Sequence, residues 1–301
     1  MPDVGVATEP KAYTHALSGG RPGATVRVRP LLTGEINAPP AFFRRPDGPL
    51  AIPRGLLAPR RLWSPVPIPA FLVDHPGAGP LLIDTGLHAS VASAPAASLG
   101  TLAARMYDIR MEASQSVPAQ LEGLGVEPRS VRAVVMTHLH YDHASGVSAF
   151  PEATFVVARA EWDAAASGRM LQGYRPRQFD HAFDWRAIDY ASTSLDSFAG
   201  FGRSVDLLGD GSIRLVFTPG HSAGHQSVVL RLHDRELLLT GDAAYRRTAI
   251  EEGELPLFCA DEHLYRRSLS EIRAYVERTP NAVVICGHDP QGWAELDAVY
   301  S

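Results

Sequence analysis

The sequence contains only two cysteines in 301 residues, Cys259 and Cys286. Two thiols are too few for a disulfide framework, so we expect both to be reduced and packed. Basic residues are not in excess either, because 28 Lys and Arg stand against 33 Asp and Glu, which gives a formal charge of −5. This balance argues against binding to nucleic acid or to an anionic membrane surface through bulk electrostatics.

Long hydrophobic runs are also missing from the sequence. No stretch approaches the ~18 apolar residues that a membrane-spanning helix needs. The first 20 residues lack the basic start and the apolar run that are typical of a secretory signal peptide. These features favour a cytoplasmic enzyme.

The composition is that of one soluble domain, with 45% hydrophobic residues. Because no linker or internal repeat divides the chain, we predict a single domain over residues 1–301. Residues 1–20 are predicted to be a mobile tip, and residues 21–65, rich in Pro, Gly and Arg, an N-terminal extension packed on the core. The aromatics of the extension (Phe42, Phe43, Trp63) either line a pocket or a subunit contact or, as we favour, pack against the body.

Short apolar runs predict several strands, among them a hairpin formed by "AFLVDH" and "PLLIDTG" and a buried strand over residues 131–137. Helical spacing predicts helices over residues 101–113, 117–125 and 261–278, the last capped by Asp261. Strands and helices mix without strict alternation. This order predicts a mixed α and β fold in which sheets pack together with helices outside.

Histidine and aspartate side chains follow directly after the ends of four predicted strands. They are His138, His140, Asp142 and His143 after the strand at 131–137, then His221, Asp242 and His288 after three later strands. Strand ends at one sheet edge are rigid and close together, so these side chains can converge on one point. Seven ligands exceed the four of a structural zinc site, which often uses cysteine. They suit two divalent ions about 3.5–4 Å apart.

With these motifs the sequence resembles the metallo-β-lactamase superfamily. The segment "HLHYDH" at 138–143 matches its H-x-H-x-D-H motif, and the other matching segments are "DTG" at 84–86, "TPGHSAGH" at 218–225, "GD" at 241–242 and "GH" at 287–288. The resemblance covers residues 65–290. It implies an αββα sandwich, two mixed sheets flanked by helices, with a dimetal centre at one edge between the sheets.

The resemblance also implies a role for each matching residue. Seven residues would hold metal: His138, His140 and His221 the first ion, Asp142, His143 and His288 the second, and Asp242 both. Asp84 and His225 match positions that orient ligands rather than bind metal. Zinc is the first expectation, although a His and carboxylate set without cysteine also accepts iron, manganese or cobalt.

Within the superfamily, which hosts many reactions, the sequence most resembles the N-acyl-homoserine lactone lactonases. The resemblance extends through "TPGHSAGHQS", "LLLTGDAAY" and "ICGHD", and it includes Tyr245, three residues after Asp242. It implies a quorum-quenching hydrolase in which a hydroxide bridging the two metals opens the lactone. Tyr245 would then stabilise the developing negative charge, and Asp142 would relay the proton.

The substrate would be a small lactone whose acyl chain needs an apolar wall. Tyr141, inside the ligand run, is the first candidate for this wall, and Phe258 is a weaker one. The apolar N-terminal segment is consistent with a homodimer. The alternative function is a related dimetal hydrolase of other lactones, esters, thioesters or phosphotriesters. A catalytically idle metal-binding protein would be expected to lack a ligand, and none of the seven is missing.

Overall fold

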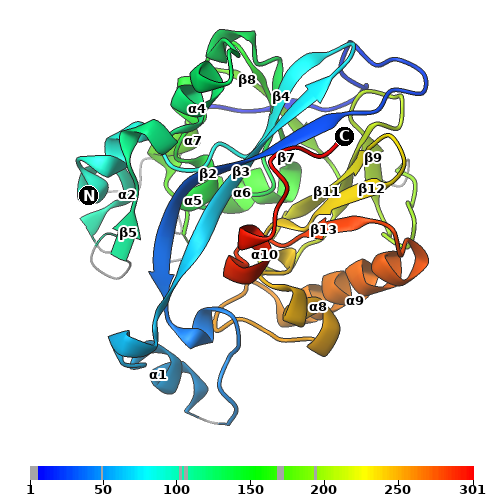
Figure 1. Ribbon diagram of the computed structural model, residues 1–301. Helices are drawn as coiled ribbons and strands as arrows, with labels where there is room; N and C mark the ends of the chain where they lie inside the picture. The colour runs from blue at the N-terminus through cyan, green and yellow to red at the C-terminus, as the bar shows by residue number, and fades with distance from the viewer. Residues whose placement is uncertain (1–5, 49, 102–103, 105–107, 168–172, 193–194) are drawn as a thin grey trace.

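The computed structural model describes residues 6–48, 50–101, 104, 108–167, 173–192 and 195–301. These residues form two β-sheets that pack face to face (Figure 1). Within them the larger sheet has eight strands, in the order β1 (Lys11–Ala12), β8 (Asp184–Ile188), β7 (Thr154–Ala158), β6 (Ala133–Val135), β4 (Gly79–Ile83), β3 (Ser64–His75), β2 (Arg27–Ala38) and β5 (Asp108–Arg110).

The smaller sheet has five strands within the same described ranges. Their order is β13 (Val283–Ile285), β12 (Glu236–Leu239), β11 (Gln226–Arg231), β10 (Ile213–Phe217) and β9 (Ser204–Asp206). Both sheets are mixed. Strands β2, β3 and β4 are antiparallel whereas β4, β6, β7 and β8 are parallel, and β13 runs parallel to β12 in an otherwise antiparallel sheet.

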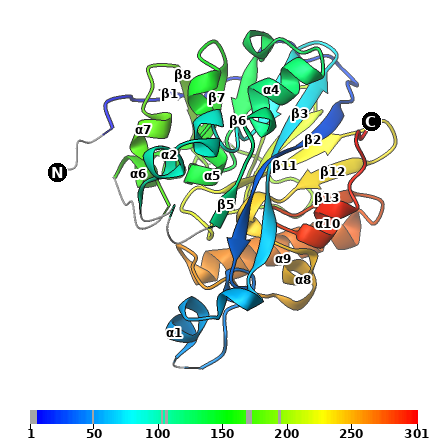
Figure 2. The same ribbon diagram turned by 60° about the vertical axis from the view of Figure 1, so that its left-hand side comes forward.

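Helices cover the outer face of each sheet (Figures 1 and 2). The helices of the described chain are α1 (Ala51–Leu56), α2 (Pro95–Leu99), α4 (Val117–Gly123), α5 (Tyr141–Ala144), α6 (Arg159–Ala166), α7 (Pro176–Phe179), α8 (Arg247–Glu252), α9 (Glu262–Arg278) and α10 (Pro290–Ala294). Helices α4 and α6 pack on the larger sheet, and α8 and α9 pack on the smaller one. The layers are therefore helix, sheet, sheet and helix.

Alternation along the strands explains this layering. In β4, Leu81 and Ile83 belong to the core between the sheets, whereas Leu82 belongs to the core beneath α4 and α6. In β12, Leu237 and Leu239 face the first of these cores, and Leu238 faces α9. Because successive side chains of a strand point to opposite faces, an all-apolar strand is suited to burial on both sides.

The N-terminal region is more integral to the fold than its sequence suggested. Residues 27–38 of the expected extension form β2, which pairs with both β3 and β5 inside the larger sheet. The connection from β2 to β3, described over residues 39–48 and 50–63 with α1, lies outside the sandwich, at the far end of the long β2–β3 ribbon (Figures 1 and 2). Of the first 20 residues, which we expected to be mobile, 6–20 are described. They include β1, paired with β8, and residues 1–5 lie outside the description.

One local expectation was wrong. Residues 108–110 of the predicted helix at 101–113 form β5 instead, and residues 102–103 and 105–107 of it are outside the described part. The predicted hairpin, the helices at 117–125 and 261–278, and the Asp261 cap, which accepts the Leu264 N–H at 2.9 Å, are confirmed. No helix in the described residues is long and apolar enough to cross a membrane.

Candidate metal centre

The seven predicted ligands come from strand ends of both sheets. Their positions are His138 and His140 after β6, Asp142 and His143 in α5, His221 between β10 and β11, Asp242 in the 3₁₀ turn Gly241–Ala243 after β12, and His288 after β13. Strands β6 and β12 are largely buried and paired on both sides, and the half-buried edge strand β13 pairs with β12, so their ends are fixed in space. The structure brings all seven side chains together.

The first group of ligands is formed by His138, His140 and His221. Nε2 of His221 lies 3.2 Å from Nε2 of His138 and 2.9 Å from Nδ1 of His140. Oδ2 of Asp242 lies 3.2 Å from Nε2 of His221 and 3.7 Å from Nε2 of His138. Three ring nitrogens and a carboxylate oxygen therefore face one point.

The second group is formed by Asp142, His143 and His288. Oδ1 of Asp242 lies 3.3 Å from Nε2 of His143 and 3.3 Å from Nε2 of His288. Oδ2 of Asp142 lies 3.9 Å and 3.6 Å from the same two nitrogens. Since one oxygen of Asp242 faces each group, its carboxylate is placed between them, as expected of a bridging ligand.

The unpaired atoms of this cluster fit metal ions. Among the buried side-chain atoms that lack a hydrogen-bond partner in the described chain are Nε2 of His143, Nε2 of His288 and Oδ1 of Asp242. Buried polar atoms without partners are costly and call for an explanation. The ligand atoms of each group lie within 4.8 Å of one another. A divalent cation at the centre of each group would satisfy them all, and histidine and carboxylate without cysteine form a suitable donor set.

Hydrogen bonds to the outer nitrogens of the histidines fix which nitrogen points inward. Nδ1 of His288 lies 2.7 Å from the Pro67 carbonyl oxygen, and Nδ1 of His143 lies 2.8 Å from Oδ2 of Asp84. A proton on each Nδ1 donates to these oxygens, so the lone pair of each Nε2 is directed into the cluster. Such outer partners set the tautomer and the orientation of metal-binding histidines.

Asp84 holds the ligand segment from outside the cluster. Its Oδ1 accepts the Thr137 N–H at 2.7 Å, and its Oδ2 accepts the Thr137 hydroxyl at 2.7 Å as well as the His143 proton. Oγ1 of Thr137 is in turn 3.0 Å from Nδ1 of His138. Asp84 adopts a left-handed conformation (φ 59°), which is unusual outside glycine and is maintained here by these contacts.

His225 lies beside Asp242 and not among the seven inward-facing ligands. Its Nε2 accepts the Asp242 N–H at 2.9 Å, and its Nδ1 is 3.0 Å from Oγ1 of Thr218. Complete burial lowers the pKa of His225 to about 3, so the ring is neutral and can accept this bond at ordinary pH. The geometry agrees with the expected orienting position.

The pKa values of the clustered side chains depend on their burial and on the charges of the neighbouring carboxylates and histidines. Burial acts to raise the pKa of Asp242, but His288, His143 and His221 around it hold that pKa well below its usual range. Burial and the neighbouring histidines lower the pKa of His138. Burial likewise lowers the pKa values of His140 and His221, which favours neutral rings in the first group, with lone pairs available for a cation.

Tyr245 lies at the edge of the cluster. Its hydroxyl is 3.2 Å from Nδ1 of His221, and the residue is only 6% exposed. The ring of Phe42 stacks on that of Tyr245, with centroids 4.6 Å apart and an angle of 9°, and meets His288 edge-on at 5.5 Å. Tyr141 is buried in the same apolar cluster as Tyr245. Phe258 is 58% exposed, so the structure does not place its ring in a buried wall.

Two residues at this site were not predicted from the sequence. Phe42 had been considered a packing residue, because nothing local shows that the β2–β3 connection returns to the metal ligands. Glu161, in the first turn of α6, is completely buried and accepts hydrogen bonds from both ligand loops. An acidic residue at a helix start usually indicates a solvated helix end, so no sequence signal identified it.

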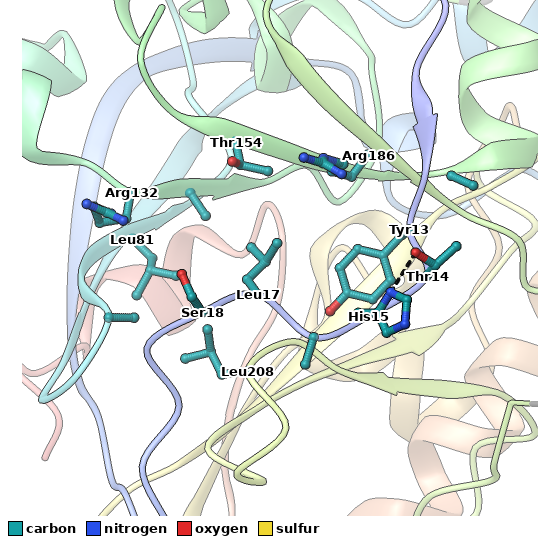
Figure 3. A pocket seen from close by; sticks show the side chains of 14 residues that line it. Tyr13, Thr14, His15, Leu17, Ser18, Leu81, Arg132, Thr154, Arg186 and Leu208 are labelled. Atoms are coloured by element: carbon teal, nitrogen blue, oxygen red, sulfur yellow. Dashed lines mark hydrogen bonds between the residues drawn. The ribbon is translucent and has the colours of Figure 1, made fainter.

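The described cavities do not coincide with the ligand cluster. One of about 330 Å³ lies between residues 12–18 and the starts of the parallel strands, where Arg132, Thr154 and Arg186 line it (Figure 3). Because His138 follows the other end of β6, this cavity is at the opposite end of the sheet. Another, of about 450 Å³, adjoins the β2–β3 connection and is lined by Phe43 and Arg246, the residue after Tyr245.

Comparisons with known proteins agree with the fold. Residues 63–288 match the metallo-beta-lactamase superfamily. The chain is 36% identical over 235 residues to the N-acyl homoserine lactonase AttM of Rhizobium radiobacter, covering 77% of this chain and 85% of that protein.

Solved structures are similar over nearly the whole chain. An N-acyl homoserine lactone hydrolase with the product N-hexanoyl-L-homoserine bound at its catalytic metal centre gives a TM-score of 0.73 at 21% identity, covering 93% of this chain and 98% of that one. The dizinc quorum-quenching lactonase AidC, also in complex with its product, gives 0.60 at 15% identity, covering 92% and 90%. These likenesses confirm the predicted αββα fold, and the chain belongs to the metallo-β-lactamase superfamily.

Proposed function

We propose that this protein is a metal-dependent hydrolase that opens the lactone ring of N-acyl-homoserine lactones and releases the N-acyl-homoserine. The observation that carries the proposal is the position of the Tyr245 hydroxyl, 3.2 Å from Nδ1 of His221 at the edge of the seven-ligand cluster. The 36% identity of this chain to the lactonase AttM, over 77% of its residues, supports the same reaction.

The seven side chains are proposed to hold two divalent ions: His138, His140 and His221 the first, Asp142, His143 and His288 the second, with Asp242 shared. When bound, two such ions would lower the pKa of a water molecule and polarise the lactone carbonyl. Zinc is proposed as the native metal, with iron, manganese and cobalt as the other metals that this donor set accepts.

Tyr245 is proposed to stabilise the oxygen of the lactone carbonyl as it becomes negatively charged. With Nε2 of His221 directed at the first group of ligands, the ring proton is on Nδ1 and donates to the Tyr245 oxygen. The phenol proton can then be donated to the substrate. A positioned donor of this kind acts at the point where charge develops in the transition state.

Asp142 is proposed to move the proton. It is 7% exposed, and its carboxylate lies beside the nitrogens of His143 and His288. It accepts a proton from the attacking water and passes it to the ring oxygen, which leaves as an alcohol when the carbon–oxygen bond breaks. The water oxygen remains on the acyl carbon, and the product is a carboxylate with a free hydroxyl.

The acyl chain is proposed to lie against an aromatic wall made by Phe42 and Tyr141. Both belong to or pack on the apolar cluster that contains Tyr245, together with Ile36, Val66 and Leu87. The wall combines residues of the β2–β3 ribbon with residues of the ligand segment. Phe258, more than half exposed, is not part of this proposal.

A panel of substrates tests the function. Metal-replete protein is assayed with N-acyl-homoserine lactones of several chain lengths, an aryl ester, a thioester and an organophosphate, and bound metals are quantified on the same sample. We expect the highest kcat/KM for an acyl-homoserine lactone. A higher value for the ester or the organophosphate would support the alternative, a dimetal hydrolase of other substrates. The cytoplasmic location and the homodimer stay predictions.

A further inference from the structure

Glu161 is a completely buried carboxylate next to the first group of ligands. It lies in the first turn of α6, and its exposure is 0%. Acidic side chains are almost never fully buried unless they are paired. Within the described residues, its carboxylate accepts hydrogen bonds from backbone N–H groups and forms no salt bridge with a cationic side chain. Its position therefore calls for an explanation beyond the stability of the helix.

The carboxylate connects two segments that are far apart in sequence. Its Oε1 accepts the N–H of Leu139 at 2.9 Å, and its Oε2 accepts the N–H of Gly224 at 3.0 Å. Leu139 lies between His138 and His140, and Gly224 lies three residues after His221. One side chain thus joins the two segments that supply all three histidines of the first group.

The approach of the second segment to α6 is as close as the backbone allows. A Cβ atom added at Gly224 would lie 2.2 Å from the backbone nitrogen of Glu161. No side chain larger than hydrogen fits at that distance, so glycine is required for the contact. The loop that carries His221 is therefore seated directly on the first turn of α6.

The charge of Glu161 also requires compensation. A buried carboxylate without a cation is expensive, even with its hydrogen bonds satisfied. The carboxylate is close to the first group, because Oε1 of Glu161 is 2.9 Å from the nitrogen of Leu139, the residue between His138 and His140. Asp84 is another buried carboxylate that holds the ligand segment, where it accepts hydrogen bonds from Thr137 and His143.

We propose that Glu161 is a positioning residue for the first metal ion, which it serves by joining the segments of His138, His140 and His221 and by balancing the charge of the ion. This inference rests on the proposed two-metal site. Asp84, by contrast, is hydrogen-bonded to a ligand ring directly, at Nδ1 of His143. The role of Glu161 is exerted through backbone N–H groups and does not require contact with metal or substrate.

The test is the retention of metal by Glu161→Gln. The amide keeps the size of the side chain but removes the charge, and its NH₂ group cannot accept one of the two backbone N–H bonds. We expect one of the two ions to bind about 10–100-fold more weakly, as for other residues that orient metal ligands, and the other to bind as in the wild type. Zinc dissociation constants are measured by competition with a chromophoric chelator, and bound ions by elemental analysis.

Asp163→Asn is the matched control. Asp163 is on the same helix with a side chain 62% exposed, and its substitution removes the same charge. We expect it to bind both ions as the wild type does. Retention of both ions with wild-type affinity by Glu161→Gln would overturn the inference and leave the proposed function intact. A wild-type protein that binds no ions would instead overturn the two-metal site, and this inference with it.

Two further measurements separate positioning from general stability. Gly224→Ala leaves Glu161 in place but displaces the loop, and it should weaken the same single ion. The alternative is that Glu161 only stabilises the fold, and the Tm of the metal-free and metal-loaded proteins tests it. If Glu161→Gln lowered both Tm values by the same amount, a positioning role would be refuted. If Glu161→Gln does not fold, Glu161→Asp replaces it, because this side chain keeps the charge but is too short to reach both N–H groups. It must bind one of the two ions more weakly than the wild type does. Wild-type affinity for both ions would refute the inference.

Discussion

Replacement of Tyr245 by phenylalanine removes one hydroxyl from the candidate site and little else. The phenol ring is 6% exposed and stacks on Phe42 at 4.6 Å, so a phenylalanine ring should occupy the same position. The lost hydroxyl lies 3.2 Å from Nδ1 of His221. The substitution therefore tests the hydroxyl itself and not the packing around it.

The expected loss of turnover follows from the proposed role as a donor to the developing oxyanion. Removal of one such donor typically lowers kcat by about 10²–10³, equivalent to about 2.7–4 kcal/mol. The Nδ1 proton of His221 would also lose its acceptor, so a weaker hold on the first ion, by up to ~10-fold, is expected in addition. Assays at saturating metal separate the two effects, because only the loss of the donor lowers kcat under those conditions.

The assay follows the release of acid from N-hexanoyl-homoserine lactone by Tyr245→Phe, with bound metal measured on the same sample. Tyr265→Phe is a suitable control, since the hydroxyl of Tyr265 is buried without a hydrogen-bond partner in the described chain. It should retain kcat. A kcat for Tyr245→Phe within about threefold of wild type, with full metal content, would refute the assigned role, since it corresponds to less than about 0.7 kcal/mol.

Three other substitutions test separate parts of the account. Asp242→Ala should lose both ions and activity together, because the two carboxylate oxygens of Asp242 face the two groups of ligands. A variant that is active although elemental analysis finds no metal in it would exclude the two-metal site. Phe42→Ala should raise KM by about tenfold for long acyl chains and less for short ones, since stacked aromatic contacts and apolar burial are lost; an equal rise for all chain lengths would contradict the acyl wall. Asp210→Asn should lower the unfolding free energy by about 2 kcal/mol at neutral pH. Burial acts to raise the pKa of Asp210, but hydrogen bonds from Ser212, Arg21 and His75 hold this pKa at about 2. A carboxyl group whose pKa is lowered by folding stabilises the fold at pH values above its pKa in the unfolded chain, near 4. In chemical denaturation, the difference in unfolding free energy between the variant and the wild type should therefore shrink as the pH falls from 4 towards 2. A difference that stays constant would contradict this prediction.

The ligand cluster could be predicted from sequence because each ligand follows directly after a short apolar strand. Such strands end where the side chains change from apolar to polar, and the spacing in "HLHYDH" is local. Asp84 and His225 were identified only through the family resemblance. Their hydrogen bonds to His143 and to the Asp242 N–H are long-range contacts that periodicity does not encode.

What escaped prediction depends on tertiary contacts. Residues 108–110 have helical spacing but form β5, because pairing with β2 outweighs local propensity. Phe42 reaches Tyr245 only because the β2–β3 connection returns to the site. Glu161 has the sequence context of a solvated helix start, and its burial becomes evident only when α6 packs beside both ligand loops.

The central claim is that lactone opening depends on two ions held by these seven residues, and zinc reconstitution tests it most directly. Chelator-treated protein is titrated with zinc while the hydrolysis of N-hexanoyl-homoserine lactone and the number of bound ions are measured together. We expect negligible hydrolysis without metal and a maximum when two ions are bound per chain. Full hydrolysis by metal-free protein, or none with two ions bound, would contradict the account.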